Sequence, residues 1–333
     1  MTPPPEREEA TAGSSAEAEA VGADLERRLD RRVLKLEQMG EGHSGLTYRV
    51  SLEAEQGILR LPPRGVRIAG PADVARQGRI MAALHRAGVP VPRIIDMADE
   101  PVIDGRPFVL MEAVAGERIE RVREAVPAAE IAASAVGVLT RIHAVPLEGT
   151  GIGDEEPRGL AQEVSRWTWL LDRAPRELTG QAPDLARRLL DELPPERPPT
   201  LVHADFHYGN LLFQGSRVVA VLDWEIAHVG QPLIDLGCLL LVSAAARSAD
   251  PEVVISVPGA GGLDVPEELV VGSYGHLEPG ELRWYLAFNF YKLSAILGYN
   301  LMLHRRGKRP DPIYETRTGT IRSFIAEGLQ RMA

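Results

Sequence analysis

The chain has a single cysteine, an excess of acidic residues and no long apolar run. Cys238 stands alone, which excludes a disulfide framework and a cysteine-rich metal site. The 47 acidic residues outnumber the 37 basic ones, and the formal net charge of −10 argues against a protein that binds the nucleic-acid backbone. No apolar stretch approaches the roughly twenty residues that span a bilayer, and no signal-peptide pattern opens the chain. We therefore expect a cytoplasmic protein with no nucleic-acid partner and no membrane partner.

The length and composition are those of an ordinary globular chain with about two domains. Its 333 residues are 44% hydrophobic and 25% charged, so disorder of the whole chain is excluded. Residues 1 to 20 are mostly Pro, Glu, Ala, Ser, Thr and Gly, and they include no Leu, Ile, Val or aromatic residue. Such a segment has too little apolar surface to offset the entropy of ordering. The composition therefore predicts a disordered tail over residues 1–22.

Strand patterns and one helical pattern follow in residues 23–115. Apolar residues at strand or helical spacing predict five strands and one helix, in the order strand 33–38, strand 46–51, strand 57–61, helix 72–85, strand 93–97 and strand 107–112. The helix is bounded by Gly88 and by two prolines. These elements predict a small N-terminal lobe, with the boundary to the next lobe near Gly116.

Helical patterns dominate residues 116–333. Six helices are predicted, over residues 128–143, 160–172, 183–193, 233–247, 279–305 and 314–332. Short apolar runs predict strands at 200–202, 211–213 and 218–222. The segment 256–275 is rich in Gly, Ser and Pro and predicts an irregular insertion. The chain as a whole is therefore expected to be an α+β protein of two lobes.

The densest polar chemistry lies in the loop 203–210 and just after the third of these short strands. Asp205 and Asn210 stand five residues apart between two apolar runs, and Asp223 follows the run 218–222. Phosphoryl transfer from a nucleotide needs a carboxylate that orients the attacking hydroxyl or accepts its proton, and it needs oxygen ligands that hold Mg²⁺ on the phosphates. Asp205, Asn210 and Asp223 fit those roles. The alternative is a polar hairpin whose carboxylates have no function.

A glycine-rich stretch precedes the second predicted strand. Gly40-Glu41-Gly42-His43-Ser44-Gly45 has the pattern G-x-G-x-x-G, but residues 46–51 continue as a strand. A dinucleotide-binding unit would open a helix there, so the context favours a flap over nucleotide phosphates and disfavours a dehydrogenase. Backbone amides would bind the phosphates, and Ser44 and Thr47 would add hydroxyl donors. A tight hairpin turn is the alternative.

Together these motifs resemble a known family. His203-Ala204-Asp205 through Asn210, then Asp223-Trp224-Glu225, and then Gly230 to Leu236 resemble the aminoglycoside phosphotransferase and choline kinase superfamily. The resemblance implies a protein-kinase-like fold of two lobes, with a small antiparallel sheet plus a helix in the first and mainly helices in the second. It further implies that Asp205 is the catalytic base and that Asn210 and Asp223 bind Mg²⁺. By the same resemblance, His203 and Asp235 support the catalytic loop.

The resemblance also assigns a nucleotide site in the first lobe. Arg60 stands on the third strand, where kinases carry a lysine that contacts the α- and β-phosphates, and Gln77 stands where the helix usually offers a glutamate partner. Arginine keeps the charge and changes the geometry, and a glutamine can still hydrogen-bond a guanidinium. The run 107–112 resembles the hinge strand, whose backbone from Leu110 to Glu112 would meet the adenine edge. An exposed strand arginine without a ligand is the alternative for Arg60.

The expected activity is the ATP- and Mg²⁺-dependent phosphorylation of a hydroxyl on a small molecule, with GTP as an open alternative to ATP. The stretch 42–50 and Asp223-Trp224-Glu225 look most like the branch fused to acyl-CoA dehydrogenases in animals, which suggests a hydroxy acid or a hydroxyacyl-CoA as the acceptor. An antibiotic, either an aminoglycoside or a macrolide, is the first alternative. A nucleotide-binding pseudokinase module, favoured by Arg60 and Gln77, is the second. A protein kinase is disfavoured because no His-Arg-Asp, Asp-Phe-Gly or Ala-Pro-Glu occurs.

Several other conspicuous residues are expected to be structural. His143, at a predicted helix end, is expected to cap the helix or to pack against it. Trp167 and Trp169 cannot share one helical face, so at most one of them is expected in the core. His203 and His207 lie in a loop without the adjoining glutamate of a zinc-binding helix, so zinc is not expected.

Overall fold

The computed structural model of the chain describes residues 6–39, 45–148, 150–246, 252, 261–275, 277 and 280–333. The chain divides into two compact units. The first unit comprises Met1–Ala115 together with the short segments Gly149–Ile152 and Asp223–Ile226. The second unit comprises Gly116–Glu148, Gly153–Leu222 and Ala227–Ala333.

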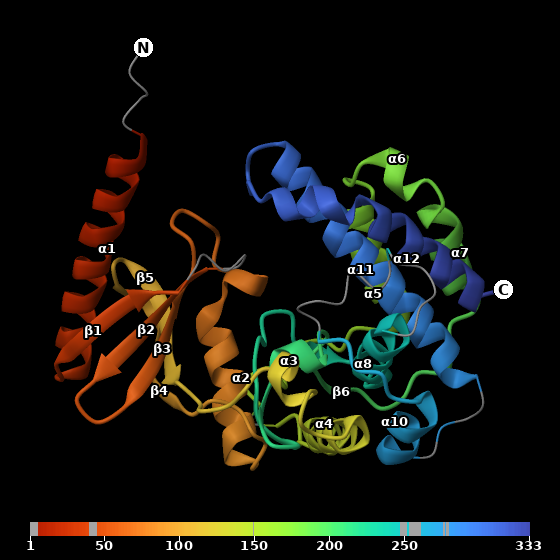
Figure 1. Cartoon of the computed structure of the whole chain (residues 1–333), viewed down its shortest axis with the longest axis horizontal. Coiled ribbons are helices and arrows are strands. Elements are labelled where there is room, and N and C mark those ends of the chain that lie inside the picture. The colour runs from red at the N-terminus through yellow and green to blue at the C-terminus, as the bar shows by residue number, and fades with distance from the viewer. Residues whose placement is uncertain are drawn as a thin grey trace. The chain divides into compact units, whose positions relative to one another are not determined.

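Five antiparallel strands form the sheet of the first unit (Figure 1). The strands are β1 (Val33–Gln38), β2 (Leu46–Leu52), β3 (Gln56–Leu61), β4 (Ile94–Ile103) and β5 (Arg106–Glu112), in the spatial order β1-β2-β3-β5-β4. All five predicted strands are present. Alternation of apolar and polar residues along β2 and β3 gives each strand one buried face, which explains why the sequence pattern identified them.

Two helices pack on opposite faces of this sheet (Figure 1). α1 (Glu6–Leu29) lies against β1 and β4, and the core on that face includes Leu59 and Leu110. α2 (Val74–Arg86) lies against β4 and β5. A Cβ atom on Gly78 would come 2.8 Å from the sulfur of Met97, so this glycine allows α2 to approach the sheet closely. The predicted helix is therefore confirmed.

The helix α1 occupies a segment that composition predicted to be disordered. Residues 1–22 were expected to form a tail, whereas the structure is helical from Glu6 to Leu29. Val21 and Leu25 are completely buried against the sheet. The prediction is therefore wrong for the helical residues. It failed because it rested on the composition of the first twenty residues, and the two apolar side chains that anchor the helix come just after them.

The second unit is built around one long helix, α11 (Glu281–Arg305). Four helices pack directly against it: α5 (Leu160–Leu171), α7 (Ala182–Asp191), α8 (Leu233–Ala246) and α12 (Thr318–Arg331). α4 (Ala128–His143) and α10 (Glu267–Tyr274) pack on each other and on α8. Two shorter helices, α3 (Ile119–Val122) and α6 (Arg176–Thr179), complete the set that Figure 1 labels in this unit. The predicted helical lobe is confirmed.

Two pairs of short antiparallel strands interrupt these helices. β6 (Thr200–Val202) pairs with β9 (His228–Gly230), and β7 (Leu211–Gln214) pairs with β8 (Arg217–Val221). The loop between β6 and β7 ends in one 3₁₀ turn, η2 (Tyr208–Asn210). Phe206 and Tyr208 in this loop are completely buried, whereas Asp205, His207 and Asn210 are partly exposed. The apolar side chains therefore anchor the loop while its polar side chains stay accessible.

The segment 256–275 is more regular than predicted. Residues 267–274 form α10, which begins after Pro266 and buries Val270. The acidic pair Glu267 and Glu268 in its first turn favours a helix start at this point. The prediction of an irregular insertion is wrong for this part, and residues 256–260 lie outside the described residues.

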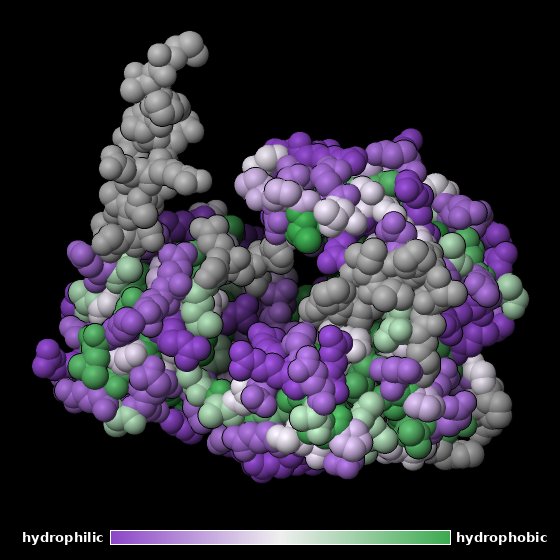
Figure 2. Space-filling model, in the orientation of Figure 1, coloured by the Kyte–Doolittle hydropathy of each residue, from purple (hydrophilic) through white to green (hydrophobic). Residues whose placement is uncertain are grey.

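Both units carry exposed large hydrophobic side chains. On the face drawn in Figure 2, hydrophobic residues are scattered among hydrophilic ones. Among the exposed large hydrophobic side chains, Leu34 lies on β1, Val66 lies in the loop after β3 and Trp169 lies on α5. No helix in the described part of the chain is long and apolar enough to cross a membrane.

Candidate active site

Asp205 lies in the loop between β6 and η2, with a partly exposed carboxylate. Its side chain is 28% exposed. The amide nitrogen of Asn210 donates to Oδ2 of Asp205 at 3.3 Å and to the backbone oxygen of Asp205 at 3.0 Å. Nε2 of His207 lies 3.4 Å from the same Oδ2. The structure therefore brings Asp205 and Asn210 together, and it adds His207, which the sequence analysis treated as structural.

His203 and Asp235 hold the backbone of this loop. Asp235, completely buried on α8, accepts the N–H of His203 at 2.8 Å and the N–H of Ala204 at 2.7 Å. Nε2 of His203 donates to the carbonyl of Leu222 at 2.8 Å, so Nδ1 accepts the N–H of Asp205 at 3.2 Å. Ala204 has φ of 69°, a left-handed conformation that costs a non-glycine residue roughly 1–3 kcal/mol. The buried hydrogen bonds to Asp235 offset that cost.

Asp205 and Asp235, whose backbone contacts were described above, are both ionised. Burial alone would raise the pKa of Asp205, but His207, Lys292 and His203 outweigh burial and hold it well below its ordinary value. Burial likewise opposes ionisation of Asp235, yet its hydrogen bond to His143 and the neighbouring His203 hold the pKa below its ordinary value. Asp205 is therefore a carboxylate at neutral pH and is able to accept a hydrogen bond or a proton.

Two further side chains support this loop without having been predicted to do so. His143, at the end of α4, donates from Nε2 to Asp235 at 3.1 Å, and its Nδ1 accepts from the hydroxyl of Tyr274 at 2.8 Å. Lys292 of α11 donates to the carbonyl of Ala204 at 2.5 Å. The side chain of His143 is packed, as predicted, with an exposed fraction of 6%, but its partner Asp235 was not foreseen. The available signal for Lys292 was a lone lysine among aromatic and apolar residues in a helical pattern.

Arg60 forms a polar cluster in the first unit. Its Nη1 donates to Oε1 of Gln77 at 3.0 Å, and Nε2 of Gln77 donates to the carbonyl of Pro71 at 3.0 Å. The guanidinium also lies 3.5 Å from Oδ1 of Asp223 and 3.8 Å from Oε2 of Glu225. Gln77 thus supplies a neutral hydrogen bond in place of the usual ion pair, and the segment Asp223–Ile226 supplies the negative charge.

Part of the glycine-rich stretch that was predicted to form a flap is described. Three of its predicted phosphate-binding residues lie outside the described residues: Gly40, Gly42 and Ser44. Gly45 directly precedes β2, and a Cβ atom there would come 2.4 Å from the carbonyl oxygen of Leu61, so a side chain would displace the neighbouring strand. Thr47 pairs with Arg60 across β2 and β3, which places both side chains on the same face of the sheet.

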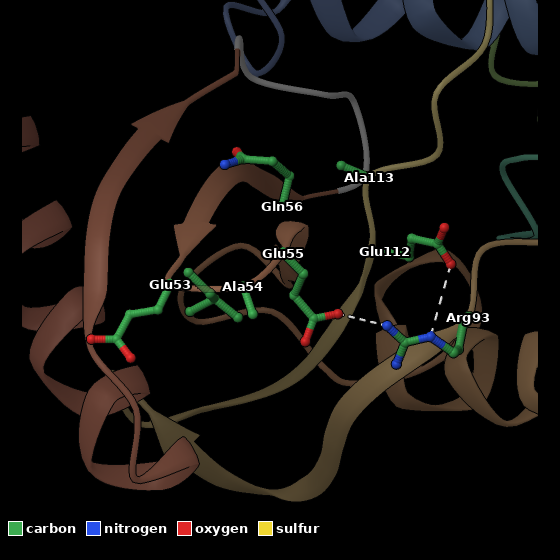
Figure 3. A pocket seen from close by; sticks show the side chains of 8 residues that line it. Glu53, Ala54, Glu55, Gln56, Arg93, Glu112 and Ala113 are labelled. Carbon is green, nitrogen blue, oxygen red and sulfur yellow. Dashed lines mark hydrogen bonds and ion pairs between the residues drawn. The ribbon is translucent and has the colours of Figure 1, made fainter.

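The predicted hinge strand, β5, ends beside a polar pocket (Figure 3). Leu110 is completely buried, and because β5 lies between β3 and β4, its backbone groups take part in the sheet. Glu112 lines the pocket with Arg93 and Glu55, and Arg93 lies 2.6 Å from Glu55 and 3.9 Å from Glu112. The side chains of both predicted residues are therefore engaged within this unit, and the backbone N–H of Glu112 donates to the carbonyl oxygen of Arg93 at 2.9 Å.

Asp223 and Asn210 each offer an oxygen to a cation. Oδ1 of Asp223 is buried and, within the described ranges, makes no hydrogen bond beyond its ion-pair contact with Arg60. The amide nitrogen of Asn210 is bonded to Asp205, so its Oδ1 is the atom it can offer. Such oxygens suit Mg²⁺. Among the described residues, no cluster of three or more His, Cys, Asp or Glu side chains is placed to bind a metal.

Sequence relatives of the chain include a kinase and part of a larger protein. The chain is 31% identical over 283 residues to acyl-CoA dehydrogenase family member 10 of Mus musculus, which covers 79% of this chain and 26% of that protein. It therefore spans only about a quarter of that relative. It is 30% identical over 245 residues to homoserine kinase of Pseudomonas aeruginosa (strain UCBPP-PA14), which covers 72% of this chain and 73% of that enzyme.

A solved structure shares the fold of the whole chain. It is a thermostable mutant of the aminoglycoside phosphotransferase APH(4)-Ia in a ternary complex with ADP and hygromycin B. The two structures align with a TM-score of 0.58 over 92% of this chain and 98% of that chain, at 16% identity. This likeness confirms the predicted kinase-like α+β fold. Residues 35–268 match the Phosphotransferase enzyme family (APH), and because that match covers most of a chain that also carries the loop of Asp205 and Asn210, the chain belongs to this family.

Proposed function

We propose that the protein is an ATP- and Mg²⁺-dependent kinase that phosphorylates a hydroxyl of a small molecule. The observation that carries this proposal is the ionised, partly exposed carboxylate of Asp205, which contacts Asn210 in a loop whose backbone is fixed by Asp235. The family match and the homoserine kinase relative support phosphoryl transfer to a small hydroxyl compound. The ADP complex of the structural neighbour supports ATP as the donor.

In this proposal Asp205 acts on the acceptor hydroxyl. Its carboxylate accepts a hydrogen bond from the hydroxyl and takes the proton as the oxygen attacks the γ-phosphorus. The bond that forms joins the acceptor oxygen to the γ-phosphorus, and the bond that breaks joins this phosphorus to the oxygen bridging it to the β-phosphate. ADP leaves with the electron pair. The contact from Asn210 and the backbone bonds to Asp235 keep the carboxylate oriented before the acceptor arrives.

Arg60, Asn210 and Asp223 would act on the nucleotide. Oδ1 of Asn210 and the carboxylate of Asp223 would hold Mg²⁺, which supplies charge neutralisation on the phosphates when bound. Arg60 would contact the α- and β-phosphates through a guanidinium that Gln77 already orients. In the structure the charge of Arg60 is balanced by Asp223 and Glu225, so phosphate oxygens would compete with these carboxylates for it.

For the acceptor we propose a hydroxy acid or a hydroxyacyl-CoA. The support is the 31% identity to an acyl-CoA dehydrogenase family member, and the matched part is a quarter of that protein. An aminoglycoside or a macrolide is the second candidate, and the hygromycin B complex of the structural neighbour is the observation that favours it. At 16% identity this neighbour argues for the fold more than for the acceptor.

The test is transfer of label from γ-labelled ATP into a pooled panel of acceptors. The panel holds hydroxy acids, hydroxyacyl-CoAs, homoserine, choline, sugars, aminoglycosides and macrolides, and each pool is run with Mg²⁺ and with EDTA. We expect a labelled hydroxy acid or hydroxyacyl-CoA that disappears with EDTA. A labelled antibiotic would replace the proposed acceptor. ATP binding that ignores Mg²⁺, with no labelled product, would refute the kinase and favour a pseudokinase module.

A further inference from the structure

A buried lysine lies directly against the loop that carries Asp205. Lys292 stands in the middle of α11 and is 1% exposed. Its Nζ donates to the carbonyl oxygen of Ala204 at 2.5 Å and lies 3.7 Å from the sulfur of Cys238. A lysine in a protein interior is costly unless polar or charged groups compensate it. Ala204 and the negative charge of Asp205 supply that compensation, so the position of Lys292 is tied to the catalytic loop.

The carbonyl that Lys292 holds belongs to the peptide group joining Ala204 to Asp205. The N–H of this same peptide group donates to Nδ1 of His203 at 3.2 Å. One residue earlier, the N–H of Ala204 donates to Asp235 at 2.7 Å. Side chains therefore bind the carbonyl and the N–H of the peptide group between Ala204 and Asp205, and also the N–H of Ala204.

This peptide group determines where the carboxylate of Asp205 points. Ala204 has φ of 69°, a conformation that an alanine leaves readily when its contacts are lost. Rotation of the peptide group would turn the Cα–Cβ bond of Asp205 and move its carboxylate relative to Asn210. Asp235 and Lys292 each hold one backbone group of Ala204, the first the N–H and the second the carbonyl.

We propose that Lys292 is a positioning residue for phosphoryl transfer, which fixes the peptide group between Ala204 and Asp205 and thereby aims the carboxylate of Asp205. This role rests on the proposed function. Lys292 acts through Asp205, because at 1% exposure its side chain is not accessible to a bound acceptor or nucleotide. A neutral side chain of the same length would leave a buried carbonyl without its donor and the left-handed Ala204 without one of its two restraints.

The test compares Lys292→Met with Tyr291→Phe in the full chain. Methionine keeps the length and removes the donor. Tyr291 is the neighbouring buried residue on α11, and its hydroxyl bonds to Thr168 of α5 at 2.7 Å, so Tyr291→Phe controls for the loss of a buried hydrogen bond on the same helix. With γ-labelled ATP, and with the acceptor found in the panel or water as the phosphate acceptor, we expect Lys292→Met to lower kcat about a hundredfold, the size of effect that a small misplacement of a catalytic group produces. The KM for ATP should change by less than about threefold, and Tyr291→Phe should leave kcat within about twofold.

Amide hydrogen exchange gives a readout that does not depend on turnover. Lys292→Met should speed exchange of the Asp205 N–H, which is bonded to His203 in the wild type. Tyr291→Phe should leave that exchange unchanged.

A double-mutant cycle separates positioning from general support of the fold. In the Asp205→Asn background, Lys292→Met should cost less than about twofold in residual transfer, because the group it positions is already gone. If Lys292→Met lowers the residual transfer of Asp205→Asn by as large a factor as it lowers that of the wild type, the proposal is overturned. If Lys292→Met does not fold, the same cycle is run with Lys292→Arg, which keeps a donor, and any loss it causes should likewise vanish beside Asp205→Asn.

Two further outcomes distinguish the proposal from the function on which it rests. Unchanged kcat in folded Lys292→Met, in a protein whose wild type transfers phosphate, would refute the role of Lys292 and leave the kinase standing. A wild type with no Mg²⁺-dependent transfer to any acceptor or to water would refute the kinase, and the positioning role with it.

Discussion

The buried carboxylate of Asp235 is predicted to stabilise the second unit by several kcal/mol. It accepts the N–H groups of His203 and Ala204 at 2.8 and 2.7 Å and the imidazole of His143 at 3.1 Å. Asp235→Asn keeps the shape and replaces one acceptor oxygen with an NH₂ group. One of the two backbone N–H groups then faces another donor instead of an acceptor.

The expected cost follows from these contacts. A buried N–H without a partner costs about 1–3 kcal/mol, and loss of charge from the hydrogen bonds that remain costs about 1 kcal/mol more. Asp235→Asn should therefore lower the free energy of unfolding of the second unit by about 2–4 kcal/mol. Where the NH₂ group takes the place of Oδ1, the left-handed Ala204 adds to this cost because its N–H loses its acceptor.

Urea unfolding followed by tryptophan fluorescence measures this change. The residues Trp167, Trp169 and Trp284 all lie in the second unit, so the signal reports mainly on it. Asp184→Asn is the matched control, because it makes the same chemical change at a side chain that is 67% exposed on α7. A fall in stability of less than about 0.5 kcal/mol in Asp235→Asn, no larger than in the control, would refute the role assigned to these hydrogen bonds.

Three other predictions concern the first unit and a buried ion cluster. Gly45→Ala should destabilise the first unit by about 1–3 kcal/mol in thermal unfolding, because its Cβ would meet a carbonyl of β3 at 2.4 Å, and an unchanged transition would contradict this packing. Arg60→Met should weaken Mg·ATP binding in calorimetry about 10- to 100-fold and Gln77→Ala by less, since Gln77 acts only by orienting the guanidinium; equal losses would contradict this order. The side chain of Glu163 is only 2% exposed, and burial alone would raise the pKa of its carboxyl. The nearby His228, Arg166 and Arg158 outweigh burial and hold this pKa below the ordinary value. The ionised Glu163 should therefore stabilise the fold above its unfolded pKa of about 4.3, and this effect should be lost as the pH falls through the lower folded pKa. The difference in free energy of unfolding between the wild type and Glu163→Gln should accordingly become smaller in acid, and a difference that does not change with pH would contradict the assignment.

The sequence predicted the residues whose roles depend on local order along the chain. Asp205 and Asn210 are five residues apart in one loop, so their contact follows from a short loop between two apolar strands. Trp167 and Trp169 could not share a helical face, and the structure buries the first to 3% and leaves the second 52% exposed. The length of the loop determines the first outcome, and the helical period determines the second.

The sequence could not predict contacts that depend on packing between distant segments. Lys292 meets the carbonyl of Ala204 across 88 residues of sequence, and His143 meets Asp235 across 92. No sequence spacing predicts either pair, because α11 and α4 contact the loop only through the packing of helices that are distant in sequence. The pairing of Arg60 with Asp223 belongs to the same class, since it depends on the segment Asp223–Ile226 joining the first unit.

The helix α1 illustrates a different limit. The composition of a segment gives the number of apolar residues in it but not their positions along a helix. Val21 and Leu25 lie one helical turn apart on one face, and two buried side chains are sufficient to anchor the end of a helix against a sheet. A periodicity test that extended past residue 20 would have found this pair.

The most direct test of the central claim is the effect of Asp205→Asn on phosphate transfer and on nucleotide binding, measured on the same protein samples. Single-turnover transfer from γ-labelled ATP gives the first quantity, and calorimetry with Mg·ATP gives the second. The proposed role of Asp205 predicts that transfer falls at least about a thousandfold while the Kd for Mg·ATP changes by less than about threefold. Transfer at the wild-type rate in Asp205→Asn would contradict the assignment of Asp205 as the group that accepts the acceptor's proton.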